Sequence, residues 1–454
     1  MTLSAELRAF AERELSSPLA SAERIGAGAS RVTWLLRDAH GRECVLRVDS
    51  GDGPVAGTEL SLAREATAYR ALRGSAVRIP VLIASRAEAL LVERAGGSPE
   101  LEDLPATERA AVMLDFAEAL AELHGVDAGK LELPGFARPR APQDHAREEL
   151  ALWRRIFDAR VVRPSPLAHF AFGWLARNAP ECRHTVLCHG DVGPGNFLHD
   201  GKRVSALLDW EFAHLGDPMD DLGWLAFRGH HMTPDAGDFT AQLVRWSMRA
   251  DLPVEPTRVA YYRAFVMLRW LISCLAALDN GAKTQGRAVY FALVGLLDAL
   301  LPRALAELAG AELPPATPPT ASGASEANDS AEVIDALLAD LHGVLLPALG
   351  AETRQRARGT LGLALHAAAF ARLGEAVRAE EHALLARGLG DALPASIAES
   401  RRALAARVAA APAQEDARWL ALLAQLGNAR LALWPMMAGL AAKPLAKIPL
   451  VMLP

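Results

Sequence analysis

The chain has 454 residues, more than a single hydrophobic core usually organises, so we expect two or three folding units. Hydrophobic residues make up 51% of the sequence and charged residues 22%, which excludes a largely disordered chain. The formal net charge of -6 offers no strongly basic face, and we therefore expect no nucleic-acid partner.

Cysteine usage and the two ends of the chain indicate where the protein works. The four cysteines form no C-x-x-C pair and no metal-like cluster with histidine, which favours a reducing, cytoplasmic location. The N-terminus is charged and helix-like, unlike a signal peptide. Prolines and lysines interrupt the apolar stretch 431–454, so we expect no stable membrane insertion.

The first hundred residues have the pattern of a small antiparallel sheet. An amphipathic N-terminal stretch leads into a glycine-rich segment, and β-like runs follow with a turn signal between the first two. One helical stretch interrupts the runs. The predicted elements are strands at 32–36 and 44–48, a helix near 62–72, and strands at 81–84 and 89–92.

Helical periodicity dominates from residue 107 onward. Two short strand signals, 185–188 and 204–208, flank a polar loop at 189–196. The segment 313–330 is rich in proline, alanine and serine and lacks periodicity, so it is interpreted as a linker. Alanine- and leucine-rich helical patterns beyond it predict a small bundle.

The polar loop and the strand after it carry the pattern H-G-D-x-x-x-x-N, then D-x-E. Asp191 and Asn196 have the spacing of the catalytic aspartate and asparagine in kinase loops. Asn196 and Asp209 offer the oxygen ligands that Mg²⁺ prefers, and Glu211 lies on the same side of an extended segment. A tripeptide H-G-D alone would also fit a surface turn. The joined pattern favours phosphoryl transfer.

The stretch from Leu187 to Arg228 resembles the aminoglycoside phosphotransferase/choline kinase-like superfamily, and more narrowly the phosphotransferases related to kinase domains fused to some acyl-CoA dehydrogenases. The likeness covers roughly residues 25–308. It implies an α+β, two-lobed protein-kinase-like fold followed by a small all-α bundle. Together with the linker interpreted above, the predicted divisions are lobes at 1–97 and 98–312, the linker at 313–330, and a helical accessory domain with an apolar tail at 331–454.

The resemblance also implies ATP and Mg²⁺ as cofactors and gives each motif residue a role. Asp191 would be the catalytic base, with Asn196 and Asp209 as magnesium ligands and Glu211 near the metal. His189 would orient the loop by hydrogen bonding, and Asp221 would brace the loop from within the protein.

Nucleotide-binding residues are expected in the strand-rich region. Gly26, Gly28 and Ser30 fit a phosphate-covering loop, although G-x-G is common in hairpins and Arg31 replaces the third glycine of G-x-G-x-x-G. Arg47 occupies the place of the usual kinase lysine. It would grip phosphate oxygens with Glu65 as its partner, and a plain surface ion pair is the alternative.

Two further parts of the nucleotide site are predicted from the strands. Val45 lies on the strand face of Arg47 and would cover the adenine. The backbone around Glu93 and Ala95 resembles the kinase hinge, which hydrogen-bonds the adenine edge.

The acceptor is expected to contact the helices after the D-x-E strand. Tyr262 and Arg269 fall on one helical face, and arginines outnumber acids there, which favours an anionic or partly apolar hydroxyl compound. These arginines could instead cap and solubilise a bundle. The resemblance favours a hydroxyacyl or hydroxyacyl-CoA compound. An aminoglycoside-type antibiotic kinase and a catalytically inactive nucleotide-binding scaffold remain alternatives, and the C-terminal domain is expected to serve a homo-oligomer or a protein partner.

Overall fold

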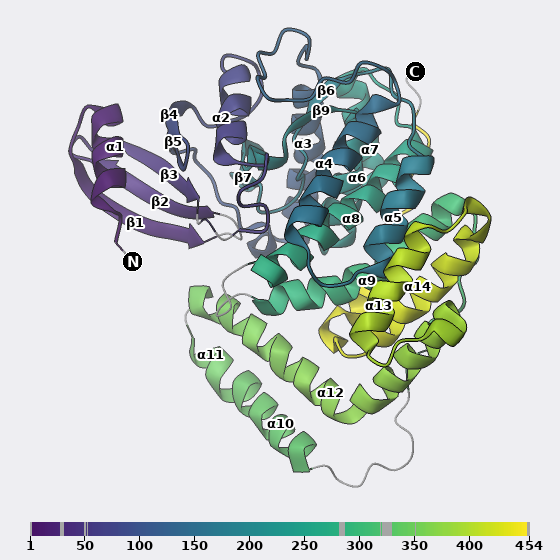
Figure 1. The fold of residues 1–454 in the computed structure, drawn as a ribbon. Helices are drawn as coiled ribbons and strands as arrows, with labels where there is room; N and C mark the ends of the chain where they lie inside the picture. The colour runs from purple at the N-terminus through teal and green to yellow at the C-terminus, as the bar shows by residue number, and fades with distance from the viewer. Residues whose placement is uncertain are drawn as a thin grey trace. The chain divides into compact units, whose positions relative to one another are not determined.

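The computed structural model describes residues 2–27, 31–49, 51, 53–280, 287–317, 319, 329–349 and 351–451 (Figure 1). The chain divides into two compact units that are both discontinuous in sequence. Unit 1 contains residues 1–152, 179–266 and 446–454, and unit 2 contains residues 153–178 and 267–445. This division cuts the chain elsewhere than the predicted lobe and linker boundaries, which remain predictions.

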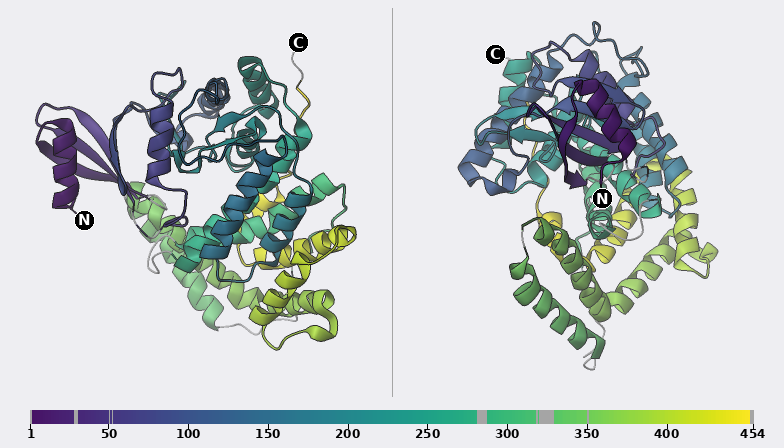
Figure 2. Two further views of the ribbon diagram at one scale, coloured as in Figure 1. Left: turned by 45° about the horizontal axis from the view of Figure 1, so that its top comes forward. Right: turned by 90° about the vertical axis from the view of Figure 1, so that its left-hand side faces the viewer.

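Unit 1 begins with a five-stranded antiparallel sheet in the order β1-β2-β3-β5-β4 (Figure 2). Helix α1 covers one face of this sheet, where Phe10 packs with Trp34, Leu36 and Leu46. Helix α2 follows β3. The bounds are α1 Ala5–Leu15, β1 Leu19–Ala27, β2 Arg31–Asp38, β3 Glu43–Asp49, α2 Leu62–Ala71, β4 Leu82–Arg86 and β5 Ala89–Glu93.

Strand β3 shows how alternation divides its side chains between the two faces of the sheet. Cys44 and Leu46 are fully buried in the core under α1. Val45 and Arg47 are half-buried and belong to the opposite face. The face that carries Arg47 is therefore available for the functional site.

The rest of unit 1 is helical, with two short antiparallel strand pairs, β6 with β9 and β7 with β8. The bounds are η1 Leu101–Asp103, α3 Ala106–His124, β6 Val186–Cys188, β7 Phe197–His199, β8 Val204–Leu207, η2 Trp210–Phe212, β9 His214–Gly216, α6 Pro218–Trp224, η3 Leu225–His231 and α7 Phe239–Ala250. Helices α4 Asp144–Arg160 and α8 Pro256–Asn280 contribute residues to both units.

The end of the apolar tail belongs to unit 1. Val451 forms an isolated antiparallel bridge with Val254, and the guanidinium of Arg263 donates to the carbonyl of Ala446 at 2.8 Å. Arg263 is fully buried. The tail therefore supplies a hydrogen-bond acceptor to a buried cation.

Unit 2 is made of helices (Figure 1). Helix α9 packs along α14 and α5 packs along α13. Gly427 of α14 allows the closest approach, because a Cβ there would lie 2.0 Å from the carbonyl oxygen of Asp298 in α9. The bounds are α5 Pro166–Arg177, α9 Arg287–Ala309, α10 Asp329–Asp340, η4 Leu341–Leu345, α11 Leu346–Ala348, α12 Ala351–Leu389, η5 Gly390–Ala392, α13 Ile397–Ala409, η6 Ala413–Glu415, α14 Asp416–Leu431, η7 Pro435–Met437 and α15 Ala438–Ala442.

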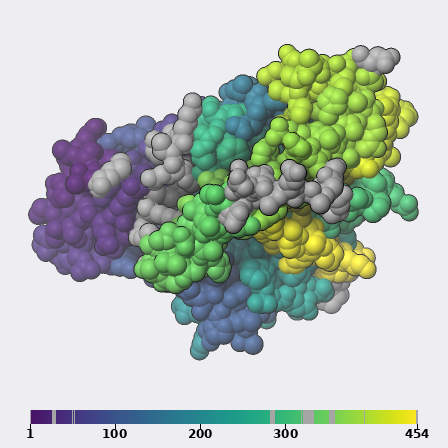
Figure 3. Space-filling model, turned by 90° about the horizontal axis from the view of Figure 1, so that it is seen from below, coloured from purple at the N-terminus to yellow at the C-terminus, as the bar shows by residue number. Residues whose placement is uncertain are grey.

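The first helices beyond the proline-rich segment expose apolar side chains. Val333 and Leu337 of α10 and Val344 and Leu345 of η4 are all exposed. Figure 3 draws this part of the chain in green. The predicted protein partner or homo-oligomer of the C-terminal domain stays a prediction.

Two helices in the described part of the chain, α8 and α9, are long and apolar enough to cross a membrane. Their most apolar windows are 89% and 72% buried within the protein, as in the core helices of many folded domains. The four cysteines, Cys44, Cys182, Cys188 and Cys274, are free and buried.

Candidate active site

The polar loop begins where β6 ends, and Asp221 of α6 holds its first residues. The carboxylate of Asp221 accepts the backbone N–H groups of His189 at 2.7 Å and Gly190 at 2.9 Å, and also the imidazole Nε2 of His124 at 3.0 Å. Burial opposes ionisation of Asp221, but the hydrogen bonds that it accepts, first among them the one from His124, prevail and lower its pKa to about 2. The loop therefore starts on a buried, ionised support.

His189 links the loop to the strand that leads to Asp209. Its Nδ1 accepts the backbone N–H of Asp191 at 3.3 Å, so its Nε2 carries the proton and donates to the carbonyl of Leu208 at 2.8 Å. The ring also lies 4.7 Å from that of Trp210, centroid to centroid. Both nitrogens are thus engaged in positioning the loop.

The loop brings Asp191 and Asn196 together. The amide nitrogen of Asn196 donates to Oδ2 of Asp191 at 2.6 Å and to the Asp191 carbonyl at 2.8 Å. Both bonds use the nitrogen, which leaves the amide oxygen for another partner. The other carboxylate oxygen of Asp191, Oδ1, accepts the guanidinium of Arg228 at 2.5 Å.

Arg47 of β3 joins the sheet to the D-x-E segment. Its guanidinium pairs with Glu65 of α2 and donates to Oδ1 of Asp209 at 2.8 Å, across 162 residues of sequence. Burial raises the pKa of Glu65 to about 7, although Arg47 opposes the shift. Burial also disfavours the charge of Asp209, but there Arg47 prevails and the pKa of Asp209 lies below its ordinary value.

Asp209 has an unusual backbone conformation. Its φ of 68° and ψ of 65° fall in the left-handed region, which aspartate tolerates better than most residues. The side chain keeps 31% exposure. An ionised, partly open carboxylate therefore stands at the end of the β8 segment.

Glu211 follows two residues later and faces a second arginine. Its carboxylate lies 2.8 Å from the guanidinium of Arg31, which also contacts Asp49 at 3.3 Å. Burial, and then the charge of Asp209, raises the pKa of Glu211 to about 8. Arg31 begins β2, directly after the glycine-rich segment.

The donor set suits a magnesium ion. The amide oxygen of Asn196 and the carboxylate of Asp209 are hard ligands, and Mg²⁺ usually binds one or two such groups while keeping several waters. Within the described ranges, no group of three or more histidine, cysteine, aspartate or glutamate side chains gathers as a metal cage. The two oxygen donors, an amide and a carboxylate, are of the kind that Mg²⁺ prefers over softer ligands.

The other predicted nucleotide residues are placed as follows. Gly26 belongs to β1, whereas Gly28 and Ser30 lie outside the described residues. Glu93 ends β5 and pairs with the guanidinium of Arg42 at 2.7 Å. Ala95 lies between β5 and Ser98, which bridges to His199 of β7.

The predicted acceptor residues need correction. Tyr262 and Arg269 are each only 1% exposed, so neither presents its side chain on an open wall. Helical spacing placed them on one face, but in the structure that face is turned into packed helices. A buried face and an acceptor wall have the same sequence pattern.

Sequence reasoning assigned no role in the site to Arg228 or His124. Arg228 ends the stretch that carries the family resemblance, but no spacing rule ties it to the loop. His124 accepts the indole N–H of Trp246 at 3.0 Å and donates to Asp221. Both contacts depend on tertiary packing, and no local signal in the sequence would have revealed them.

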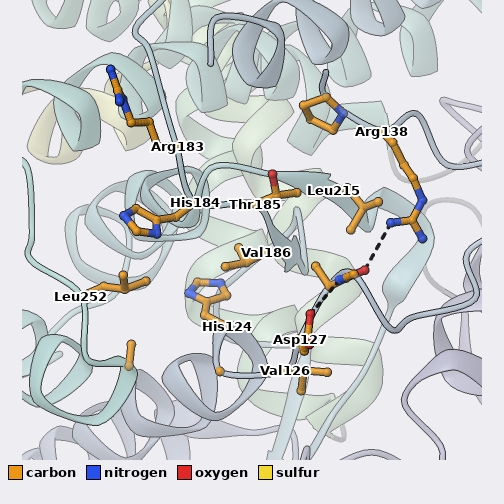
Figure 4. A pocket seen from close by; sticks show the side chains of 15 residues that line it. His124, Val126, Asp127, Arg138, Arg183, His184, Thr185, Val186, Leu215 and Leu252 are labelled. Atoms are coloured by element: carbon orange, nitrogen blue, oxygen red, sulfur yellow. Dashed lines mark hydrogen bonds between the residues drawn. The ribbon is translucent and has the colours of Figure 1, made fainter. Parts of the chain in front are cut away.

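A pocket of about 580 Å³ opens at the other end of β6 (Figure 4). It is lined by basic side chains, among them Arg138, Arg183 and His184, and by the C-terminal ends of α3 and α7. Arg138 donates to the carbonyls of Ala128 and Leu131. The guanidinium of Arg138 therefore lies beside backbone carbonyls. The residues that line the pocket include none of the predicted catalytic or nucleotide residues.

An antiparallel sheet with a strand arginine, a helical region with an H-G-D-x-x-x-x-N loop, and an acid held by that arginine together define a kinase-like phosphotransferase. Comparison with known proteins agrees. Residues 21–262, more than half of the chain, match the phosphotransferase enzyme family, and the chain belongs to that family.

Two curated relatives and one solved structure illustrate the similarity. The chain is 30% identical over 218 residues to acyl-CoA dehydrogenase family member 11 of Gallus gallus, across 45% of this chain and 27% of that protein. It is 29% identical over 208 residues to hygromycin-B 4-O-kinase of Escherichia coli, across 42% of this chain and 57% of that protein. The match thus spans about a quarter of the length of the first relative and somewhat over half of the length of the second.

The solved structure comes from Ralstonia eutropha, and its suggested identity is an aminoglycoside phosphotransferase. It superposes with a TM-score of 0.52 at 21% identity and covers 68% of this chain and 100% of its own. This likeness confirms the predicted α+β, protein-kinase-like fold.

Proposed function

We propose that the chain is an ATP- and Mg²⁺-dependent kinase that moves the γ-phosphoryl group to a hydroxyl group of a small molecule. One observation carries the proposal: Arg47 contacts Asp209 at 2.8 Å, while Asn196 contacts Asp191 at 2.6 Å. Phosphoryl transfer needs a cation for phosphate oxygens, hard ligands for magnesium and a carboxylate that takes a proton. These four side chains supply all three.

At the reacting end, Asp191 takes the proton of the acceptor hydroxyl. The hydroxyl oxygen forms a bond to the γ-phosphorus, the bond from that phosphorus to the β–γ bridging oxygen breaks, and ADP leaves. Asn196 and Asp209 would hold Mg²⁺, which neutralises phosphate charge when bound, with Glu211 beside them. His189 and Asp221 keep the loop in place through the hydrogen bonds described above.

At the nucleotide end, Arg47 grips phosphate oxygens with its planar fork, and buried Glu65 fixes the orientation of that fork. Val45 covers the adenine from the same strand face. The backbone from Glu93 to Ala95 hydrogen-bonds the adenine edge, and the segment of Gly26, Gly28 and Ser30 covers the phosphates.

A hydroxyacyl or hydroxyacyl-CoA compound is the acceptor we favour. The similarity to a protein named as an acyl-CoA dehydrogenase family member supports it. An aminoglycoside-type acceptor is the second candidate, because the hygromycin-B kinase matches over a comparable length of this chain. A catalytically inactive nucleotide-binding scaffold is the third reading, and the presence of Asp191, Asn196 and Asp209 in the kinase pattern argues against it.

The deciding experiment incubates the protein with Mg-ATP and a panel of hydroxyl compounds that includes hydroxyacyl-CoAs, free hydroxy acids and hygromycin B, and follows product mass. We expect one class to gain a phosphoryl group only when Mg²⁺ is present. Matched controls are the same mixtures with Asp191→Asn. Tight ATP binding with no phosphorylated product from any class would favour the scaffold instead.

A further inference from the structure

Arg228 lies in η3, a π-helical segment directly after α6, and its guanidinium reaches back to the catalytic loop. It contacts Oδ1 of Asp191 at 2.5 Å and donates to the carbonyl of Pro194 at 3.0 Å. π-helical turns are rare and are frequent at functional sites. The arginine thus ties together the two ends of the turn between Asp191 and Pro194.

The loop backbone is shaped around the stem of this arginine. Gly193 has a φ of 154°, and a Cβ there would lie 2.6 Å from Cγ and 2.7 Å from Cδ of Arg228. A larger residue would push the arginine away. The side chains of Arg228 and Asp191 are only 19% and 22% exposed, so the pair is not a loose surface contact.

The carboxylate of Asp191 is held at both oxygens, by Asn196 at Oδ2 and by Arg228 at Oδ1. A carboxylate has about four acceptor positions, so these two bonds fix its plane and still leave room for the proton of an acceptor hydroxyl. The acceptor must therefore approach Asp191 beside a fixed positive charge. That charge offsets the negative charge of Asp191, so an ammonium group loses the attraction that an unpaired carboxylate would give it, and an anionic acceptor loses the repulsion.

We infer that Arg228 is a positioning and specificity-determining residue: it aligns Asp191 and selects an anionic or uncharged hydroxyl compound over a polycationic one. The inference rests on the proposed function and deepens it. It needs no contact between Arg228 and the nucleotide, so it predicts an effect on turnover rather than on ATP affinity.

The test compares Arg228→Ala and Arg228→Lys with wild type, and Arg245→Ala is the matched control. Arg245 is half-exposed on α7 and contacts Glu118 at 3.6 Å. Turnover is measured with Mg-ATP and two probes, a hydroxyacyl-CoA as the anion and hygromycin B as the polycation, with ATP hydrolysis in water as a third readout.

We expect Arg228→Ala to lower kcat at least tenfold with the KM for ATP within about twofold, because a misaligned base costs rate more than binding. Arg228→Lys should recover part of the loss, and millimolar guanidinium should partly restore Arg228→Ala. The ratio of hygromycin B to hydroxyacyl-CoA turnover should rise in Arg228→Ala. Arg245→Ala should match wild type.

Gly193→Ala provides a second route, since it displaces the arginine stem without removing the charge. Gly193→Ala should therefore lower kcat as Arg228→Ala does, and it supplies the test if Arg228→Ala does not fold. Unchanged kcat in a folded Arg228→Ala, or in Gly193→Ala, overturns the alignment role, and an unchanged acceptor ratio overturns the specificity role. A wild-type protein that turns over no probe and hydrolyses no ATP refutes the proposed function itself.

Discussion

Each unit contains a buried network of arginines and carboxylates, and the two networks differ at one end. In unit 1, Arg47 pairs with Glu65, which is fully buried, and with Asp209, which is 31% exposed. In unit 2, the two acids of the network, Glu381 and Asp298, are 5% and 8% exposed, and each pairs with an arginine of a helix. The members of the unit 2 network are Glu381 and Arg401, paired at 2.6 Å, and Asp298 and Arg430, paired at 3.1 Å.

The electrostatics of the two networks differ in the same way. Burial raises the pKa of Asp298 despite Arg430, whereas Arg47 prevails over burial at Asp209 and lowers its pKa. A closed network joins helices, and its net contribution to stability is often small. The open network keeps the partly exposed, ionised carboxylate of Asp209 beside a strand arginine, as the proposed magnesium site requires. Similar ion pairs can thus serve packing in one region and chemistry in another.

The largest expected effect comes from the proton acceptor. Asp191→Asn keeps size but removes the base and a negative charge, so turnover on the acceptor should fall by about a hundredfold or more. Nucleotide binding should survive. Steady-state kinetics and ATP titration check the two parts separately, and near-normal turnover would remove Asp191 from the role of base.

The open end of the unit 1 network predicts a magnesium effect. Asp209→Ala deletes a charged ligand, and we expect it to weaken ATP binding in the presence of Mg²⁺ by roughly tenfold or more. ATP binding without Mg²⁺ should change less. Calorimetric titrations with and without the ion measure both, and an unchanged magnesium dependence would show that Asp209 is not a ligand.

Matched substitutions in the two networks sharpen the comparison. Because the phosphate contact uses the planar, fork-shaped guanidinium, ATP affinity should fall in the order Arg47, Arg47→Lys, Arg47→Ala and Arg47→Glu. The change from arginine to lysine alone should lower the affinity severalfold. The control is Arg401→Ala in unit 2, which should alter thermal stability and leave ATP affinity unchanged. Equal ATP binding by all four forms at position 47 would contradict the strand assignment.

The smallest effect concerns stability and pH. The pKa of Asp221 is about 2, below its ordinary value of 3.8. A lowered pKa in the folded state stabilises the fold at pH values above the pKa of the unfolded state. For Asp221 this stabilisation amounts to about 2 kcal/mol. This stabilisation should be complete near neutral pH and be lost as the pH falls from about 4 toward 2.

Asp221→Asn should therefore lower the free energy of unfolding by about 2 kcal/mol at pH 7, and its gap to wild type should narrow in acid. Denaturant unfolding across that pH range measures the gap. A gap that does not depend on pH would mean that the hydrogen bonds of Asp221, and not its charge, carry the effect.

Much of the fold and of the loop could be predicted because the signals are local. Alternation gave the sheet, and the spacing of Asp191 and Asn196 placed both in one loop, where the structure brings them into contact. Arg47 and Val45 were assigned to one strand face from period two alone. Such patterns act within a few residues of sequence.

The rest depended on contacts between distant segments. No pattern shows that Arg228 reaches Asp191, or that Tyr262 is buried and not on an acceptor wall. The proline-rich segment favours a separable C-terminal bundle, and on that basis a chain ending near Pro319 would fold without it. The packing of α9 on α14 and the bond from Arg263 to Ala446 predict instead that such a chain loses stability.

The most direct measurement follows ATP labelled in its γ-phosphoryl group through a single turnover with the acceptor that the panel reveals. We predict one label on the acceptor hydroxyl for each ADP formed by wild type, and almost none with Asp191→Asn at equal ATP occupancy. Label that remains in bound ATP, or that appears only as inorganic phosphate, would contradict the assignment of this chain as a small-molecule kinase.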